Sequence, residues 1–258
     1  GTPAELEAAD PARLLEHSKR LDAEHKNVSH ALRALCSVNV SEVPDNPDFA
    51  CSFIRAGADV NVAPPPSKQT PVHNAAAQGK AETVRVLIGA RADVTKVSSS
   101  GRSPLHMAAA FGNAATVQLL VEARADLDSV EDSFKRTALF AGSDSGKTEI
   151  ARCLIEARSN LEVKDANEFS ALDMAMKRGH AETAKLLIEA GADTASKDKW
   201  GKAPLEQRTP EALSIREEVA KFAEERKRRS SELAQSSEPA QGSQPSRRGT
   251  SSRSPLTR

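Results

Sequence analysis

The feature that most constrains this chain is a short pattern that recurs every 33 or 34 residues. In most copies a Thr or Ser stands before a Pro or Ala and an apolar residue. The pattern begins at Thr70, Ser103, Thr137, Ser170 and, in a weaker form, Ala203. Successive starts are 33, 34, 33 and 33 residues apart. A fixed period of this size indicates a stack of similar units, none of which buries its apolar face alone.

Two further columns keep the same phase. Nine residues after each of the first four starts stands a glycine, at Gly79, Gly112, Gly146 and Gly179. A Leu followed by Ile or Val recurs at 87–88, 120–121, 154–155 and 187–188. Because three separate columns agree in phase, chance does not explain the repeat.

Local rules translate each unit into two helices. The Thr or Ser is a good N-cap, and the Pro that follows in two units needs no helical hydrogen-bond partner for its nitrogen. The Gly predicts a left-handed end to this first, Ala-rich helix. A second helix, such as 81–90, carries apolar residues at helical spacing, and the polar stretch 93–103 leads back to the next unit. We therefore expect paired helices joined by hairpin loops.

The best copies of the motif are Thr70-Pro71-Val72-His73-Asn74-Ala75 and its equivalent from Ser103 to Ala108. With the Gly and the Leu-Ile columns in phase, the chain resembles an ankyrin-repeat array, whose signature is T-P-L-H-x-A at a period of about 33 residues. The match is strongest over 66–198. The resemblance implies an all-α helical solenoid of paired antiparallel helices with hairpin loops.

Five segments follow from this interpretation. Residues 1–27 are expected to form an N-terminal helical cap, and 28–65 a degenerate first repeat with an insertion. Four repeats occupy 66–198, and 199–229 is predicted to be a degenerate last repeat with a capping helix. Residues 230–258 are rich in Ser and Arg and have almost nothing to bury, so we expect a disordered C-terminal tail.

Composition narrows the function classes. Aromatic residues make up 3% of the chain, with seven Phe, one Trp and no Tyr, which favours stacked thin helices over a broad sheet. The formal net charge is zero, which argues against nucleic acid as a partner of the whole chain. No apolar run is long enough to span a membrane, and no membrane partner is expected. Three cysteines without ligand spacing predict neither a disulfide framework nor a zinc site.

We expect a monomer in the cytoplasm. The basic run 226–229 could also act as a nuclear-import patch, a contact for an acidic surface or a target for phosphorylation of the serines after it. A solvated helix end is an equal alternative for the same run.

One segment imitates a catalytic motif. Residues 141–148 match a relaxed phosphate-binding loop in which Ala replaces the first Gly. However, Gly146 and Lys147 have the phase of Gly79 and Lys80, which predicts the ordinary turn between paired helices. For His73 and His106 the family resemblance implies bonds to neighbouring backbone. We therefore predict no catalytic residue, no metal site, no cofactor and no enzymatic activity.

One column of the repeat is unusual in its residue type. It holds Arg91, Arg124 and Arg158 at the position where Gly57 and Gly191 end the equivalent helix in other units. A left-handed conformation costs a residue with a side chain about 1 to 2 kcal/mol. Either the arginines bond the last helical carbonyls, or they form a row for an acidic partner.

The candidate binding residues follow from the scarce rings. In ankyrin-like repeats the hairpin tips and exposed positions of the first helix form a concave surface. The residues of this chain that map to it are Met107, Phe111, Arg102, Phe134, Arg136, Phe169, Arg178, Trp200 and Lys202. Aromatic and Arg side chains dominate binding energy at interfaces. The alternative is that these rings fold back on neighbouring hairpins.

The sequence thus predicts a protein-interaction scaffold that binds an acidic segment bearing apolar anchors. A second interpretation is that the chain is the recruiting module of a larger multidomain enzyme or signalling protein, of which it is a fragment.

Overall fold

A computed structural model describes residues 45, 47–111 and 113–236 of the chain. Its helices are α3 (Pro47–Arg55), α4 (Pro71–Ala77), α5 (Ala81–Gly89), α6 (Pro104–Phe111), α7 (Ala114–Glu122), α8 (Ala138–Asp144), α9 (Thr148–Glu156), α10 (Ala171–Arg178), α11 (Ala181–Ala190), the short 3-10 helix η2 (Pro204–Glu206) and α12 (Pro210–Ser236). Within these ranges there is no β-strand. The predicted all-α repeat fold is confirmed.

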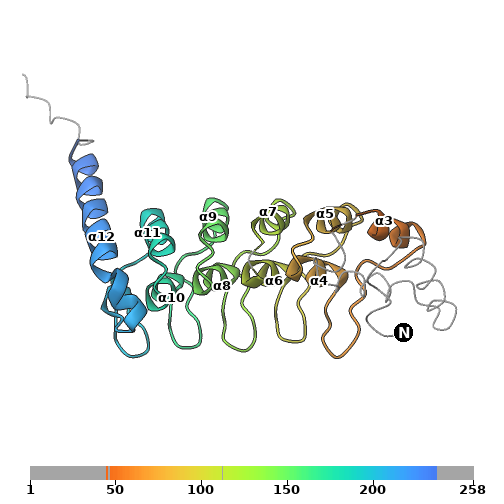
Figure 1. The fold of residues 1–258 in the computed structure, drawn as a ribbon, viewed down its shortest axis with the longest axis horizontal. Helices are drawn as coiled ribbons and strands as arrows, with labels where there is room; N and C mark the ends of the chain where they lie inside the picture. Colours follow the sequence, from red (N-terminus) through yellow and green to blue (C-terminus); the bar gives the residue numbers. More distant parts are fainter. Residues whose placement is uncertain (1–44, 46, 112, 237–258) are drawn as a thin grey trace, which may run out of the picture.

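The helices form two rows in a long stack. Helices α4, α6, α8 and α10 make an inner row, and α5, α7, α9 and α11 lie beside them in an outer row (Figure 1). Each helix packs mainly on its own partner and on the equivalent helices of the adjacent repeats. Between the rows lies the core, in which the predicted leucine column is completely buried at Leu87, Leu120, Leu154 and Leu187.

Two inner helices begin with the predicted side-chain cap, whereas Thr70 before α4 makes none. Thr137 and Ser170 accept hydrogen bonds through their side-chain oxygens from the backbone N–H three residues later. At the other end Gly79, Gly146 and Gly179 adopt φ values of 69°, 66° and 78°, which a residue with a Cβ adopts only under strain. The chain therefore reverses in a tight turn and starts the outer helix at once.

Three of the four outer helices, α5, α7 and α9, end in left-handed residues that are not glycine. Arg91, Arg124 and Arg158 have φ values of 65°, 61° and 66°, as their shared phase with Gly57 and Gly191 predicts. Their side chains are exposed. Within the described part of the chain, no guanidinium of this column hydrogen-bonds a helical carbonyl or pairs with a carboxylate. The compensating bond proposed from the sequence is therefore absent at all three positions.

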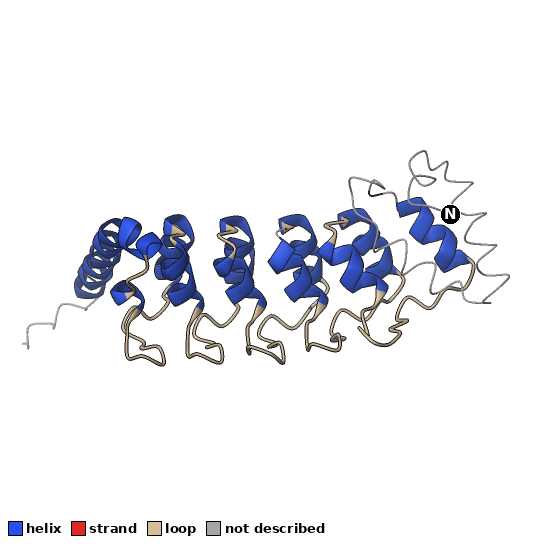
Figure 2. Cartoon of the chain, turned by 60° about the horizontal axis from the view of Figure 1, so that its bottom comes forward, coloured by secondary structure: helices blue, strands red, loops and turns tan. Residues whose placement is uncertain are grey.

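The hairpin loops all project to the same side of the stack (Figure 2). Their tips are joined in series by backbone hydrogen bonds, from Ser99 N to Ser67 O at 2.8 Å, from Asp132 N to Ser100 O at 3.1 Å, from Ala166 N to Phe134 O at 2.8 Å and from Lys199 N to Asn167 O at 3.2 Å. The loops thus form one continuous row, and we call the face made by this row and the adjoining sides of the inner helices the inner face.

The C-terminal end differs from the sequence prediction in where the capping helix stops. In the last repeat, only the single turn η2 stands in the place of an inner helix. The capping helix α12 does not stop at residue 229 but continues to Ser236, so residues 230–236 are helical and not part of a disordered tail. Residues 237–258, the rest of the predicted tail, lie outside the described residues.

Helix α12 closes the stack with one apolar stripe. Ala212, Ile215, Val219 and Ala223 are buried against α10 and α11. Their spacing of three and four residues puts them on one side of the helix. The predicted N-terminal cap at 1–27 lies outside the described residues, as does most of the predicted insertion. No helix in the described ranges has the length and apolar content needed to cross a bilayer.

Candidate partner-binding surface

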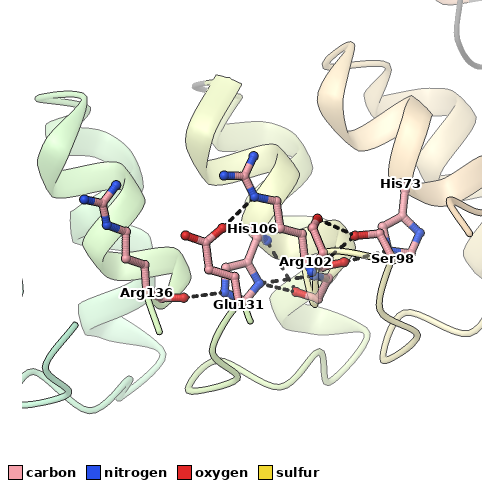
Figure 3. A network of polar contacts seen from close by, with 8 residues as sticks. His73, Ser98, Arg102, His106, Glu131 and Arg136 are labelled. Carbon is pink, nitrogen blue, oxygen red and sulfur yellow. Dashed lines mark hydrogen bonds and ion pairs between the residues drawn. The ribbon is translucent and has the colours of Figure 1, made fainter. Parts of the chain in front are cut away.

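The inner face is built on a hydrogen-bond network that starts each inner helix. The ring Nδ1 of His73 accepts from the backbone N–H of Thr70 at 3.1 Å and from its hydroxyl at 2.7 Å. The opposite ring nitrogen, Nε2, bonds the carbonyl oxygen of Arg102 in the next repeat at 3.0 Å. His106 repeats this arrangement with Ser103 and with the carbonyl oxygen of Arg136 at 2.9 Å (Figure 3).

These histidines are structural. Their bonds to neighbouring backbone confirm what the family resemblance implied for the column. Burial lowers the pKa of His73 from 6.5 to about 4, and burial also lowers the pKa of His106. Both rings are therefore neutral near pH 7, with Nε2 carrying the proton that bonds the next hairpin. They fix the hairpin loops to the inner helices.

In the fourth repeat an aspartate takes the histidine's place. The Oδ2 atom of Asp173 accepts from the N–H and the hydroxyl of Ser170, at 2.9 and 2.7 Å. Its Oδ1 atom has no hydrogen-bond partner among the described residues. Burial, together with the nearby Asp198 carboxylate, raises the pKa of this carboxyl group.

Three arginines of the predicted site already have partners. Arg102 Nε lies 2.6 Å from Glu131 Oε2, and Arg178 Nε lies 2.7 Å from Asp144 Oδ1. Arg136 Nε lies 3.7 Å from Asp165 Oδ2, which is buried. Each of these guanidinium groups therefore pairs with a carboxylate of an adjacent repeat, and their contact with an acidic partner stays a prediction.

The sequence analysis did not predict these carboxylates as partners of the arginines, although the positions of two of them in the repeat indicate it. Ser98, Glu131, Asp165 and Asp198 are in one column, five or six residues before the start of each motif. All four are buried at the base of a hairpin. Acidic residues at a fixed phase in a polar loop therefore mark internal partners for the arginines of this face.

The predicted rings divide into two groups. Phe111, Phe134 and Trp200 keep 62%, 49% and 61% of their surface exposed. The guanidinium of Arg136 lies over the Phe134 ring, 4.8 Å from its centroid, and over the Phe140 ring, 4.9 Å away.

Two other predicted contact residues are buried, and their assignment to an exposed surface is wrong. Met107 is 8% exposed and belongs to the main core. Phe169 is 4% exposed because it folds back onto Phe140 and Met174. Its ring also contacts Trp200, with centroids 5.4 Å apart. For Phe169 the alternative that rings pack on neighbouring hairpins is correct.

Two hollows open on the inner face. The smaller, of about 110 Å³, lies between α6 and α8 and is lined by Arg102, His106, Ala110, Glu131, Arg136, Thr137, Ala141, Asp144 and Ser145. The larger, of about 350 Å³, lies at the C-terminal end and is lined by Phe169, Lys177, Asp198, Trp200, Lys202, Gln207, Arg208 and Thr209. Phe169, Trp200 and Lys202 of the predicted site meet here. Phe111 lines neither hollow.

The segment that imitates a phosphate-binding loop has a helical geometry. Residues 141–144 form the second half of α8, and Gly146 makes the left-handed turn to α9. Lys147 is the N-cap of α9. The residues thus follow the repeat register. No group of three or more His, Cys, Asp and Glu in the described ranges is arranged to hold a metal ion.

The basic run is the continuation of the capping helix. Arg226 donates from Nε to the carbonyl oxygen of Glu189 at 3.2 Å, which ties α12 to the end of α11. Residues 227–229 are exposed on α12. Nuclear import and phosphorylation of the following serines stay predictions.

Comparison with known families agrees with the repeat register. The family model described as ankyrin repeats, in three copies, matches residues 38–131 and again 107–198. Together the matches cover more than half of the chain. No curated protein matches it closely.

Proposed function

The chain belongs to the ankyrin-repeat family, and we propose that it is an interaction scaffold that binds a segment of a partner protein on its inner face. Ankyrin repeats are generally protein–protein interaction modules. Neither this general role nor the fold identifies the partner, so the site must be argued from its residues.

The observation that carries the proposal is the exposure of three large rings on the inner helices and hairpin loops. Phe111 ends an inner helix, and Phe134 and Trp200 stand in hairpin loops. Aromatic side chains contribute most to binding when a partner removes them from water. The row of hairpins that bears two of these rings is held by backbone bonds and neutral histidines, so little ordering is required on binding.

The charge of the inner face favours an acidic segment at its C-terminal end. Arg102, Arg136 and Arg178 are neutralised within the protein. Lys202 and Arg208 form no ion pair within the described residues. We therefore expect the apolar anchors of the segment to meet Phe134 and Trp200, and its acidic residues to meet the last hairpin.

The test is selection of peptides from a random display library on the full chain, followed by affinity measurements. We expect enriched peptides that combine acidic and apolar residues. Phe134→Ala and Trp200→Ala should each weaken their binding by more than about 1 kcal/mol, roughly fivefold or more, with little change in the unfolding midpoint.

Leu213→Ala is the matched control, because Leu213 is an exposed apolar side chain on α12 that lines neither hollow of the inner face. It should leave binding unchanged. The assignment fails if the control weakens binding as much as Phe134→Ala, or if both ring variants act only by unfolding the array.

A further inference from the structure

The larger hollow of the inner face combines aromatic walls with cations. Trp200 stands on the last hairpin, with Phe169 tilted by 36° against it. Lys177, from α10, holds its Nζ 4.4 Å from the centre of the Phe169 ring. Lys202 follows on the same hairpin as Trp200, and Arg208 comes from the turn before α12.

The hollow has an excess of positive charge. Asp198 supplies the one carboxylate of the lining, and both of its oxygen atoms already accept hydrogen bonds within the protein. Oδ1 accepts from the N–H groups of Trp200 and Lys202, and Oδ2 accepts from Gln207 Nε2. The side chains of Lys202 and Arg208 make no hydrogen bond or ion pair with any described residue. Three cations and one carboxylate therefore leave a formal charge of +2 in the lining.

This charge fits a phosphate monoester better than a carboxylate. A phosphorylated hydroxyl carries about −1.5 to −2 near pH 7, whereas a carboxylate carries −1. The exposed face of Trp200 adds an apolar platform beside the cations, and aromatic rings stack on such a face in offset or tilted contacts. A volume of about 350 Å³ lies in the range of small-ligand pockets.

We propose that the hollow lined by Lys177, Trp200, Lys202 and Arg208 binds a phosphotyrosine side chain. The phosphate group meets the three cations, and the phenyl ring lies against Trp200. This inference rests on the proposed function, because the phosphotyrosine is carried by the bound partner segment.

Phenyl phosphate is a suitable probe, and the protein carries its own reporter. The chain has one Trp and no Tyr, so its tryptophan fluorescence comes from Trp200 alone. Titration of the full chain near neutral pH should give a saturable change in emission. Phenyl phosphate should bind at least tenfold more tightly than inorganic phosphate or benzoate, and its affinity should fall below about pH 6, where it becomes a monoanion.

Single-residue variants identify which cations bind the phosphate group of the probe. Lys202→Ala and Arg208→Ala should each weaken phenyl phosphate binding at least fivefold. Lys199→Ala is the matched control: it removes the same charge from the same hairpin but does not line the hollow. It should change the affinity less than twofold.

Several results overturn the proposal. Equal affinity for inorganic phosphate means a plain anion site, and equal affinity for benzoate means a carboxylate site. Absence of saturation, or equal effects of Lys199→Ala and Lys202→Ala, means that no specific site exists.

The two proposals fail separately. If library peptides bind through Phe134 while phenyl phosphate does not bind, only the phosphotyrosine site is wrong. If phenyl phosphate binds as expected while no library peptide is enriched, the hollow binds an aryl phosphate but the proposed segment binding is wrong.

Discussion

At the scale of single residues, buried polar groups decide how the repeats respond to acid. His73 is completely buried, and burial holds its pKa at about 4 instead of 6.5. Between these values the unfolded chain binds a proton that the folded chain does not. The free energy of unfolding therefore falls as the pH drops below about 6.5, and it continues to fall until the folded-state pKa is reached.

We predict that acidification from about pH 7.5 to pH 5 costs about 2 kcal/mol through His73 alone. His73→Gln removes this titration, so the variant should lose less stability than the parent over the same range, although it starts from a lower value at neutral pH. Urea unfolding at the two pH values measures the difference. Equal losses in parent and variant would contradict the buried, neutral state of the ring.

At the scale of one helix, the ends of the outer helices α5, α7 and α9 store strain. Arg91, Arg124 and Arg158 have positive φ, and their guanidinium groups make no compensating bond within the described residues. Left-handed backbone costs such a residue about 1 to 2 kcal/mol, while Gly loses about 0.5 to 1 kcal/mol more chain entropy on folding.

We therefore predict that replacing any one of these arginines with Gly raises the free energy of unfolding by up to about 1 kcal/mol. Thermal or urea unfolding of each variant measures the gain. Arg124→Gln is the control: it removes the charge but keeps the strained Cβ, so it should give no such gain. If the Gly variants lose stability, the side chains contribute a contact that offsets the strain.

Elements were predictable from the sequence where a local rule determines them. The N-cap at Thr137 and the left-handed turn at Gly146 follow from residue types alone. The burial of Phe169 does not, because the direction of a ring at a hairpin depends on Phe140 and Trp200 in adjacent repeats. The end of α12 was also missed: Ser230 marks a change of composition, but the helix continues past it.

Part of the geometry of the candidate site was predictable from the sequence, and its ion pairs were not. Trp200 and Lys202 were expected on one surface, and they line one hollow. The ion pairs of Arg102 with Glu131 and of Arg136 with Asp165, both in the next hairpin, were not predicted. Pairing across 29 residues is a tertiary contact that helical periodicity does not encode.

At the scale of the whole molecule, stability depends on contacts between neighbours. Because each repeat touches mainly the next, the array behaves as a chain of coupled units. Damage at one end should therefore weaken the nearest repeats first.

Val219→Asp tests this coupling, because Val219 is completely buried where α12 covers the last repeat. An unpaired charge there should cost about 3 kcal/mol or more. Hydrogen exchange should speed up in α10 and α11 and change little in α4 and α6. Uniform acceleration along the array would mean that it unfolds as a single unit. Lys221→Asp, at an exposed position of the same helix, is the control.

The same pattern of contacts has a mechanical consequence. A tensile force applied between the two ends of the row would act on the interfaces between repeats in series. The weakest interface at one end would therefore break while the interior repeats stayed folded. Repeats would then peel away one at a time. Each unfolded repeat would lengthen the chain by a similar step. The protein would therefore extend gradually under load, and the repeats would refold when the load is removed.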